Sequence, residues 1–212
     1  MSTPQSYYVP VDAGETEFTE KRSRFLGHVR RVETEAEARA FLDETRKKYY
    51  DARHNCWCYV LHEGGVVRYG DDGEPQGTAG QPMLNVFQRE GVENVVCVVT
   101  RYFGGVLLGA GGLTRAYAKS AKDALDAAGK ARMRLWSAVT VDCPYPMLER
   151  LKLLAAAHGG TVEGTDFGAA VSVRILLPQE NAAGFDAALT ELSAGTMTAR
   201  RGGERFLPGP RE

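Results

Sequence analysis

The segment from Arg101 to Tyr117, RYFGGVLLGAGGLTRAY, is the most unusual part of this 212-residue chain. Five glycines fall within nine of its positions, directly after the apolar run Val95–Val99 and before an alanine-rich segment that favours a helix. Glycine loses more backbone entropy than other residues when it is ordered, so such a cluster indicates turns with positive φ or close contact of the backbone with a neighbour. The sequence therefore predicts a buried strand that turns into a helix.

This turn is the first candidate for a site that binds an anion. Free N–H groups at a helix N-terminus favour negative charge, and Arg101 and Arg115 lie on either side of the glycines. A structural alternative stays open, since short glycine motifs also serve to bring a strand close to a helix. Lys119 and Lys122 follow on the same helical face, but each has an aspartate four residues later, which favours ion pairs on a solvated surface. The candidate anion- or RNA-binding residues are Arg101, Tyr102, Gly104, Gly105, Gly109, Gly111, Gly112 and Arg115.

The composition limits the partners of the chain. Its 26 basic and 27 acidic residues give a net charge of −1, so an RNA contact would require a local basic patch. No apolar run approaches the length of a membrane span, and the N-terminus lacks a secretory signal pattern. The four cysteines do not form a disulfide-dense pattern. We therefore expect a soluble, cytoplasmic protein with no membrane partner.

The pattern of apolar residues predicts two α+β domains. Residues 1–20 are expected to form an irregular leader, residues 21–133 the first domain and residues 134–201 the second. The basic stretch 130–134 is expected to be a linker, and residues 202–212 a disordered tail.

Periodicity also predicts the elements of each domain. In the first domain we expect strands at 21–32, 55–61, 66–69 and 92–100, the last covered on both faces, and helices at 34–49, 82–88 and 113–128. Thr34 and Glu37 fit a capping box, and Gly129 fits a helix end. In the second domain we expect strands at 135–141, 161–165, 171–177 and 197–201, with one helix after Pro146 and one after Pro178. That order is the βαββαβ unit of ferredoxin-like domains.

Two further stretches concentrate polar groups. Asp71–Gly80 holds three carboxylates within four residues, but its spacing does not match an EF-hand loop, and a solvated loop is favoured over metal binding. On a strand, His54, Cys56 and Cys58 would share one face. Zinc would need a second pair of ligands, so core packing is favoured over a metal site or a Cys–His nucleophile. We therefore expect no metal, no cofactor and no assigned catalytic residue.

Several stretches together are more specific than any one motif. They are residues 21–25, 52–57, 71–82 and 101–117. In this order and spacing, the chain resembles the YigZ/IMPACT family over residues 18–130, and residues 135–201 look like the C-terminal domain of its bacterial members. The resemblance implies an N-terminal α/β sandwich similar to the second domain of a small-subunit ribosomal protein. It also implies a ferredoxin-like C-terminal domain similar to those of an elongation factor, although fold alone does not fix function.

The resemblance and the glycine turn together favour a non-enzymatic, monomeric binding protein that engages RNA or the ribosome and modulates translation. Arg101 and Arg115 would hold phosphates, and Phe103 is expected to be buried rather than stacked on a base. The expected polar specificity groups across the same groove are His54, Asn55, Asp72 and Glu74. Two alternatives stay open: a hydrolase or phosphate-handling enzyme that uses His54, Asp72 and Glu74, and a protein-interaction module.

Overall fold

The structure is a computed structural model that describes residues 7–212. Its internal contacts divide the chain into two compact units. The N-terminal unit comprises the residues up to Arg132 together with Pro208–Glu212, and the C-terminal unit comprises Met133–Leu207. Among the described residues, no helix has the length and apolar character needed to cross a membrane.

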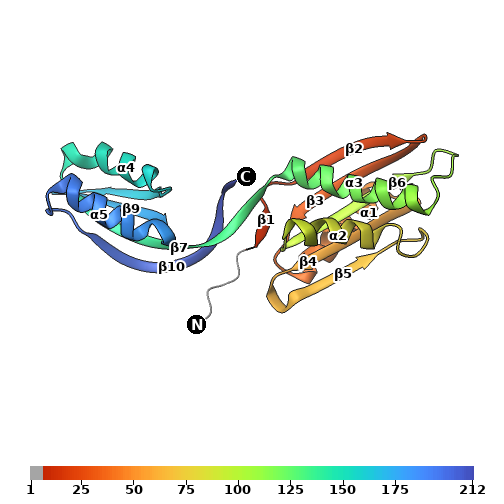
Figure 1. Cartoon of the computed structure of the whole chain (residues 1–212), viewed down its shortest axis with the longest axis horizontal. Helices are drawn as coiled ribbons and strands as arrows, with labels where there is room; N and C mark the ends of the chain where they lie inside the picture. Colours follow the sequence, from red (N-terminus) through yellow and green to blue (C-terminus); the bar gives the residue numbers. More distant parts are fainter. Residues whose placement is uncertain (1–6) are drawn as a thin grey trace. The chain divides into compact units, whose positions relative to one another are not determined.

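The N-terminal unit is a five-stranded antiparallel sheet with helices on both faces (Figure 1). In sheet order, its strands are β2 (Gly14–Glu20), β3 (Ser23–Arg31), β6 (Val95–Tyr102), β4 (His54–Leu61) and β5 (Val66–Gly70). The helices are α2 (Gly80–Glu90) and α3 (Ala110–Ala128) on one face and α1 (Glu35–Lys48) on the other. A short 3-10 turn at Glu63–Gly65 joins β4 to β5.

The central strand β6 is buried on both faces, as its unbroken apolar sequence predicts. Cys97 and Val99 belong to the core beneath α2 and α3, whereas Val96 and Val98 belong to the core beneath α1. Successive side chains of a strand point to opposite faces, so an apolar residue at every position requires cover on both.

Local signals set the ends of the helices. Thr34 caps α1: its hydroxyl oxygen accepts a hydrogen bond from the N–H of Glu37 at 3.2 Å. The carboxylate of Glu37 accepts in turn from the N–H of Glu33 at 2.7 Å, in a variant of the capping box. Gly91 and Gly129 end α2 and α3 with φ values of 63° and 68°, which glycine adopts without steric cost.

The C-terminal unit has the predicted ferredoxin-like order. Its elements are β7 (Lys130–Cys143), α4 (Leu148–Ala157), β8 (Thr161–Phe167), β9 (Val171–Pro178), α5 (Ala182–Ser193) and β10 (Ala199–Arg211), with 3-10 turns at Tyr145–Met147 and Gln179–Asn181. Within this unit, β8 pairs with β9, β9 pairs with β7 and β7 also pairs with β10; β1 (Tyr8–Pro10) pairs with the start of β7 in the same sheet. Val141, Val173 and Ile175 of its strands form one core with Leu151 of α4 and Phe185 of α5.

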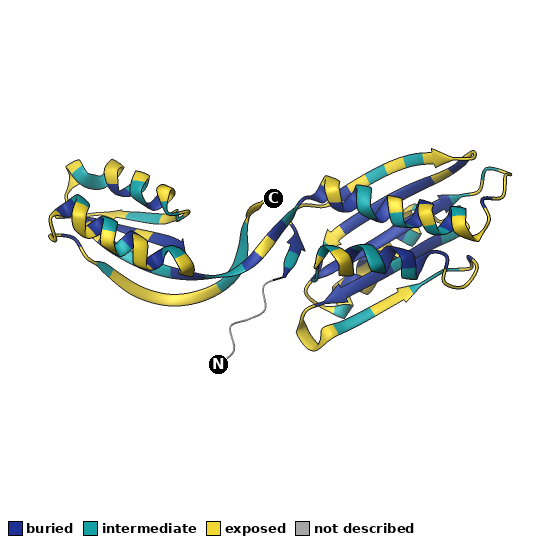
Figure 2. Ribbon diagram, viewed as in Figure 1, coloured by how far each residue is buried: buried dark blue, intermediate teal, exposed yellow. Residues whose placement is uncertain are grey.

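Three segments that were expected to be irregular are strands instead. Within residues 1–20, β1 (Tyr8–Pro10) pairs with the start of β7, and β2 pairs with β3; residues 1–6 lie outside the described part. The expected linker 130–134 begins β7, and the expected disordered tail 202–212 belongs almost entirely to β10, which pairs with β7. β2 and β10 are mostly exposed (Figure 2), so backbone hydrogen bonds hold them more than apolar burial does, and their polar composition gives little strand signal.

Replacement of Gly14 by alanine tests how closely β2 packs on α3. A Cβ at Gly14 would lie 2.0 Å from the carbonyl oxygen of Ala124, so the strand or the helix would have to move. Overpacking of this kind costs about 1–3 kcal/mol, and urea denaturation should show that loss for Gly14→Ala. The control is Gly111→Ala, where the nearest atom is the flexible Nη1 of Arg115 at 3.4 Å, and no loss is expected. Equal stability of the two variants would contradict the close packing.

Candidate functional site

The loop of residues 103–109, between β6 and α3, lies against the turn that joins β2 to β3. Gly104 makes the contact: a Cβ at this position would lie 2.0 Å from the carbonyl carbon of Arg22. The N–H of Gly104 also donates to the hydroxyl of Ser23 at 3.2 Å. Gly104 therefore serves close backbone approach, and its amide is already used within the protein.

The other glycines of the segment have different roles. Gly105 and Gly109 adopt φ values of 82° and 73°, so the path of the loop requires glycine there. Gly111 and Gly112 lie in the first turn of α3, and their N–H groups have no hydrogen bond among the described residues. The sequence led us to expect amide donors at Gly104, Gly105, Gly111 and Gly112, and of these the amide of Gly104 is used within the protein.

Arg101 is buried and paired. Its Nη1 donates to Oε1 of Glu74 at 2.7 Å, and its Nη2 donates to the hydroxyl of Ser23 at 3.2 Å. Only 6% of the Arg101 side chain and 4% of the Glu74 side chain are exposed. The charge of Arg101 is thus compensated inside the protein.

Neighbouring side chains complete this buried pair. The hydroxyl of Tyr117 in α3 donates to the same Oε1 of Glu74 at 2.8 Å, and burial raises the pKa of Tyr117 far above its usual value, so it stays a donor. The guanidinium carbon of Arg101 lies 5.5 Å from the ring centres of both Phe25 and Phe103. Contacts at this distance are within the range of cation–π attraction.

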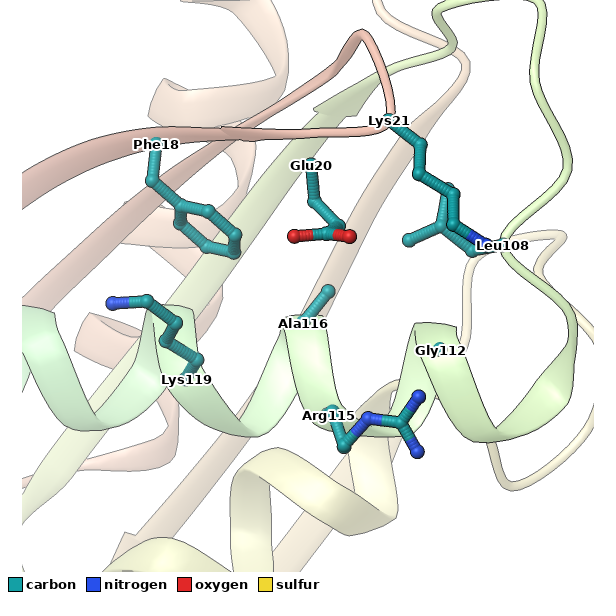
Figure 3. Close-up of a pocket in the computed structure, with 8 residues that line it drawn as sticks. All are labelled: Phe18, Glu20, Lys21, Leu108, Gly112, Arg115, Ala116 and Lys119. Atoms are coloured by element: carbon teal, nitrogen blue, oxygen red, sulfur yellow. The ribbon is translucent and has the colours of Figure 1, made fainter.

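Arg115 lies in a different hollow from Arg101. This hollow of about 160 Å³ lies between α3 and the turn that joins β2 to β3 (Figure 3). The residues that line it are Phe18, Glu20, Lys21, Leu108, Gly112, Arg115, Ala116 and Lys119. Lys119 pairs with Asp123, whereas Lys21 and Arg115 form no ion pair with any described residue. We call this surface the basic hollow.

Arg101 lines a larger cavity of about 370 Å³, which we call the loop cavity. Its polar lining is Arg53, His54, Glu74 and Arg101. Its apolar lining includes Phe103, Leu107, Leu108 and Leu113. Leu108 lines the basic hollow as well, so the two spaces are neighbours on either side of this residue.

Only two of the four predicted polar-groove residues line the loop cavity. They are His54 and Glu74. The Asp72 carboxylate accepts from the N–H of Asn55 at 2.7 Å and from Nη2 of Arg46 at 3.0 Å. The amide oxygen of buried Asn55 accepts from the Thr100 hydroxyl at 2.6 Å. Asp72 and Asn55 therefore hold the acidic loop to β4 and do not reach the cavity.

The remaining polar groups of these stretches also have structural partners. The Asp71 carboxylate accepts from the N–H groups of Gly77, Ala79 and Gly80 and so caps the start of α2. Burial raises the pKa of the Cys56 thiol, which disfavours the thiolate that a nucleophile needs. Within residues 7–212, no three side chains of the kinds that ligate metals come together.

Tyr102 lines neither space. Its hydroxyl donates to the Asp51 carboxylate at 2.7 Å, and burial together with this carboxylate raises the pKa of Tyr102 to about 12. The guanidinium of Arg24 lies 5.6 Å from its ring centre. Tyr102 is the last residue of β6, next to Arg101, and its side chain contacts Asp51 and Arg24.

Sequence reasoning missed Ser23 and Tyr117, which complete the buried pair, and Lys21, which lines the basic hollow. Lys21 and Ser23 belong to one of the stretches that carry the family resemblance, and Tyr117 ends another. The family resemblance therefore pointed to these residues, but only the fold shows that Ser23 and Tyr117 contact the buried pair and that Lys21 lines the hollow.

The fold and the site together define a class: a two-unit α+β protein in which a glycine-rich loop covers a buried Arg–Glu pair. Comparison with known families agrees. Residues 21–125 match the Impact N-terminal domain, and residues 141–196 match a domain of unknown function (DUF1949).

Similar proteins extend over most of the chain. IMPACT family member YvyE of Bacillus subtilis (strain 168) is 34% identical, over 95% of this chain and 94% of that protein. IMPACT family member YigZ of Escherichia coli (strain K12) is 35% identical, over 84% of this chain and 88% of that protein. A solved structure described as a hypothetical protein has a TM-score of 0.59 at 32% identity, over 94% of this chain and 97% of that one. The chain belongs to the IMPACT family.

The buried pair predicts an asymmetric response to mutation. Glu74→Gln leaves the buried guanidinium of Arg101 without a counter-charge, which should lower the free energy of unfolding by about 3–5 kcal/mol. Trp57 of β4 reports on this unit, so urea denaturation followed by its fluorescence, with Trp136 replaced by phenylalanine, measures the loss.

Two controls accompany this measurement. Glu17→Gln breaks the exposed pair with Arg24 and should change stability little. Joint replacement of Arg101 by methionine and Glu74 by leucine should recover much of the loss, because no unpaired charge is then buried. A Glu74→Gln variant as stable as the Glu17→Gln variant would contradict the role assigned to the pair.

Proposed function

We propose that this protein is a non-enzymatic RNA-binding protein of the cytoplasm that acts in translation, and that its basic hollow holds RNA phosphates. The observation that carries the proposal is the set of unpaired cations around this hollow. Lys21 is contributed by the turn between β2 and β3, and Arg115 is contributed by the first turns of α3. These two cations outnumber the one carboxylate of the lining, that of Glu20.

The low net charge of the chain means that RNA binding would depend on a local cluster of cations. The whole chain has a net charge of −1, so it offers no general attraction for nucleic acid. Most other cations of the N-terminal unit are neutralised nearby, as in the pairs Arg24–Glu17 and Lys130–Glu90. Cations without an internal partner can exchange water for phosphate, and arginine does so with two N–H groups at once.

The free amides of Gly111 and Gly112 support the same proposal. They lie in the first turn of the helix that carries Arg115, and Gly112 lines the hollow. Backbone N–H groups at a helix N-terminus favour an anion, so they add to the side-chain charge. Arg101, in contrast, is buried against Glu74 and has a positioning role in this proposal.

The role in translation, through RNA or the ribosome itself, rests on a different argument. The sequence resembles a family whose two domains are similar to domains of a ribosomal protein and an elongation factor, and the chain belongs to that family. The competing enzymatic hypothesis has less support. Its cluster of His54, Asp72 and Glu74 does not assemble, because the Asp72 carboxylate is bound to Asn55 and Arg46.

The salt dependence of RNA binding tests the proposal. We expect a fluorescein-labelled single-stranded RNA to bind the full chain, with an affinity that falls as salt rises. Each phosphate contact on single-stranded RNA contributes about 0.7 to the slope of log affinity against log salt, so Arg115→Ala and Lys21→Ala should each lower the slope by up to that amount.

Matched controls separate the hollow from general charge. Arg89→Ala on α2 and Lys47→Ala on α1 remove the same charges from exposed positions away from the hollow, and should leave the slope unchanged. If the wild-type chain does not bind RNA, or if all four variants respond equally, the proposal is wrong.

A further inference from the structure

The loop cavity has the composition of a ligand pocket and lies beside the basic hollow. Contrary to the expected burial, Phe103 is 45% exposed, and Leu107 beside it is 82% exposed. Both line the cavity, whose volume of about 370 Å³ falls in the range of small-ligand sites. Large exposed apolar side chains above a buried polar floor are characteristic of a binding site.

The floor of the cavity is polar but nearly neutral. The charges of Arg101 and Glu74 cancel at a separation of 2.7 Å, so the pair attracts neither a free cation nor a free anion strongly. Arg53, which is exposed and forms no ion pair with a described residue, adds one positive charge to the lining outside this pair. The charge of Arg53 disfavours an ammonium group, and a neutral ligand group with polar edges and an apolar face fits the floor itself. The apolar rim would cover the face of such a group.

The floor offers hydrogen-bond acceptors. Nδ1 of His54 lies 2.9 Å from the backbone carbonyl oxygen of Asp72, which can only accept, so Nδ1 is the donor of this contact. In the tautomer that carries its proton on Nδ1, Nε2 is an acceptor. Oε1 of Glu74 accepts from both Arg101 and Tyr117, whereas Oε2 has no hydrogen bond among the described residues. A ligand that donates two N–H groups from one nitrogen would satisfy both acceptors.

The neighbouring hollow supplies the charge that the floor lacks. Leu108 lines both spaces, and Lys21 extends toward it from the turn between β2 and β3 (Figure 3). A ligand whose neutral flat ring fills the cavity and whose negative group reaches past Leu108 would use both sites at once. A nucleotide has this distribution of polarity.

We propose that the loop cavity binds one unpaired RNA base that carries an exocyclic amino group, stacked on Phe103, while an adjacent phosphate lies in the basic hollow. This inference rests on the proposed RNA-binding function and adds its recognition element. Unpaired bases are commonly held by an aromatic ring and read at their polar edges. Adenine and cytosine present an amino group with two N–H donors, whereas uracil presents a single N–H between two carbonyl oxygens, which the acceptors of His54 and Glu74 would repel.

Three RNA probes of equal charge test this. They are single-stranded hexamers of adenylate, of uridylate and of abasic ribose phosphate, each with a fluorescein label, titrated with the full chain at one salt concentration. The adenylate hexamer should bind about tenfold more tightly than the abasic hexamer, because stacking of one base on an aromatic ring contributes about that factor to affinity. It should also bind more tightly than the uridylate hexamer. Phe103→Ala should remove most of that advantage without changing the affinity for the abasic hexamer.

Two variants make the result specific. His54→Ala removes one acceptor from a half-buried position and should bring the adenylate and uridylate affinities together. Tyr50→Ala removes an aromatic ring that is 86% exposed after α1 and does not line the cavity, and should have no effect on any probe.

The outcomes separate the two proposals. If all three hexamers bind equally and Phe103→Ala changes nothing, while Arg115→Ala still weakens binding, the base pocket is wrong and RNA binding at the basic hollow stands. If no hexamer binds, the RNA function fails and the base pocket fails with it. Loss of the adenylate preference in both Phe103→Ala and His54→Ala supports the pocket.

Discussion

The buried ion pair of Arg101 and Glu74 is the interaction on which the rest of the site depends. It joins β6, the acidic loop after β5, the turn between β2 and β3 through Ser23, and α3 through Tyr117. Burial of two charges costs several kcal/mol, which only good geometry and additional hydrogen bonds offset. Ser23 and Tyr117 provide those bonds, so segments far apart in the sequence are fixed around one guanidinium group.

This pairing also decides where positive charge is available. Because Arg101 is neutralised within the protein, the cations that can meet a ligand are Lys21 and Arg115 beyond Leu108 and the exposed Arg53 in the lining of the loop cavity. The glycine segment therefore does not surround one anion pocket with two arginines. It separates a cavity whose buried floor is a neutral ion pair from a basic surface, and each favours a different part of a ligand.

Strong local patterns made much of the fold predictable. The apolar run of β6 required cover on both faces, and the Thr34 cap and the βαββαβ order followed from short-range signals. β1 and β10 were missed because the position of a polar strand at the edge of a sheet is set by its pairing partner.

The site was predictable in part: His54, Glu74 and Arg101 do share a cavity, but the direction of the Asp72 carboxylate depends on Arg46, which lies 26 positions away. Phe103 was expected to be buried, yet it lies past the end of β6 in the loop and is 45% exposed.

The same contacts connect the two halves of the proposed nucleotide site. Gly104 rests on the backbone of Arg22, and the N–H of Gly104 and Nη2 of Arg101 both donate to the hydroxyl of Ser23. The turn that carries Lys21 is therefore bound to the loop that carries Phe103. A ligand that orders either segment would order the other through these bonds, so base and phosphate would be recognised together rather than additively. In this proposal Arg101 would contribute to binding by holding the two segments together, because its charge is compensated by Glu74.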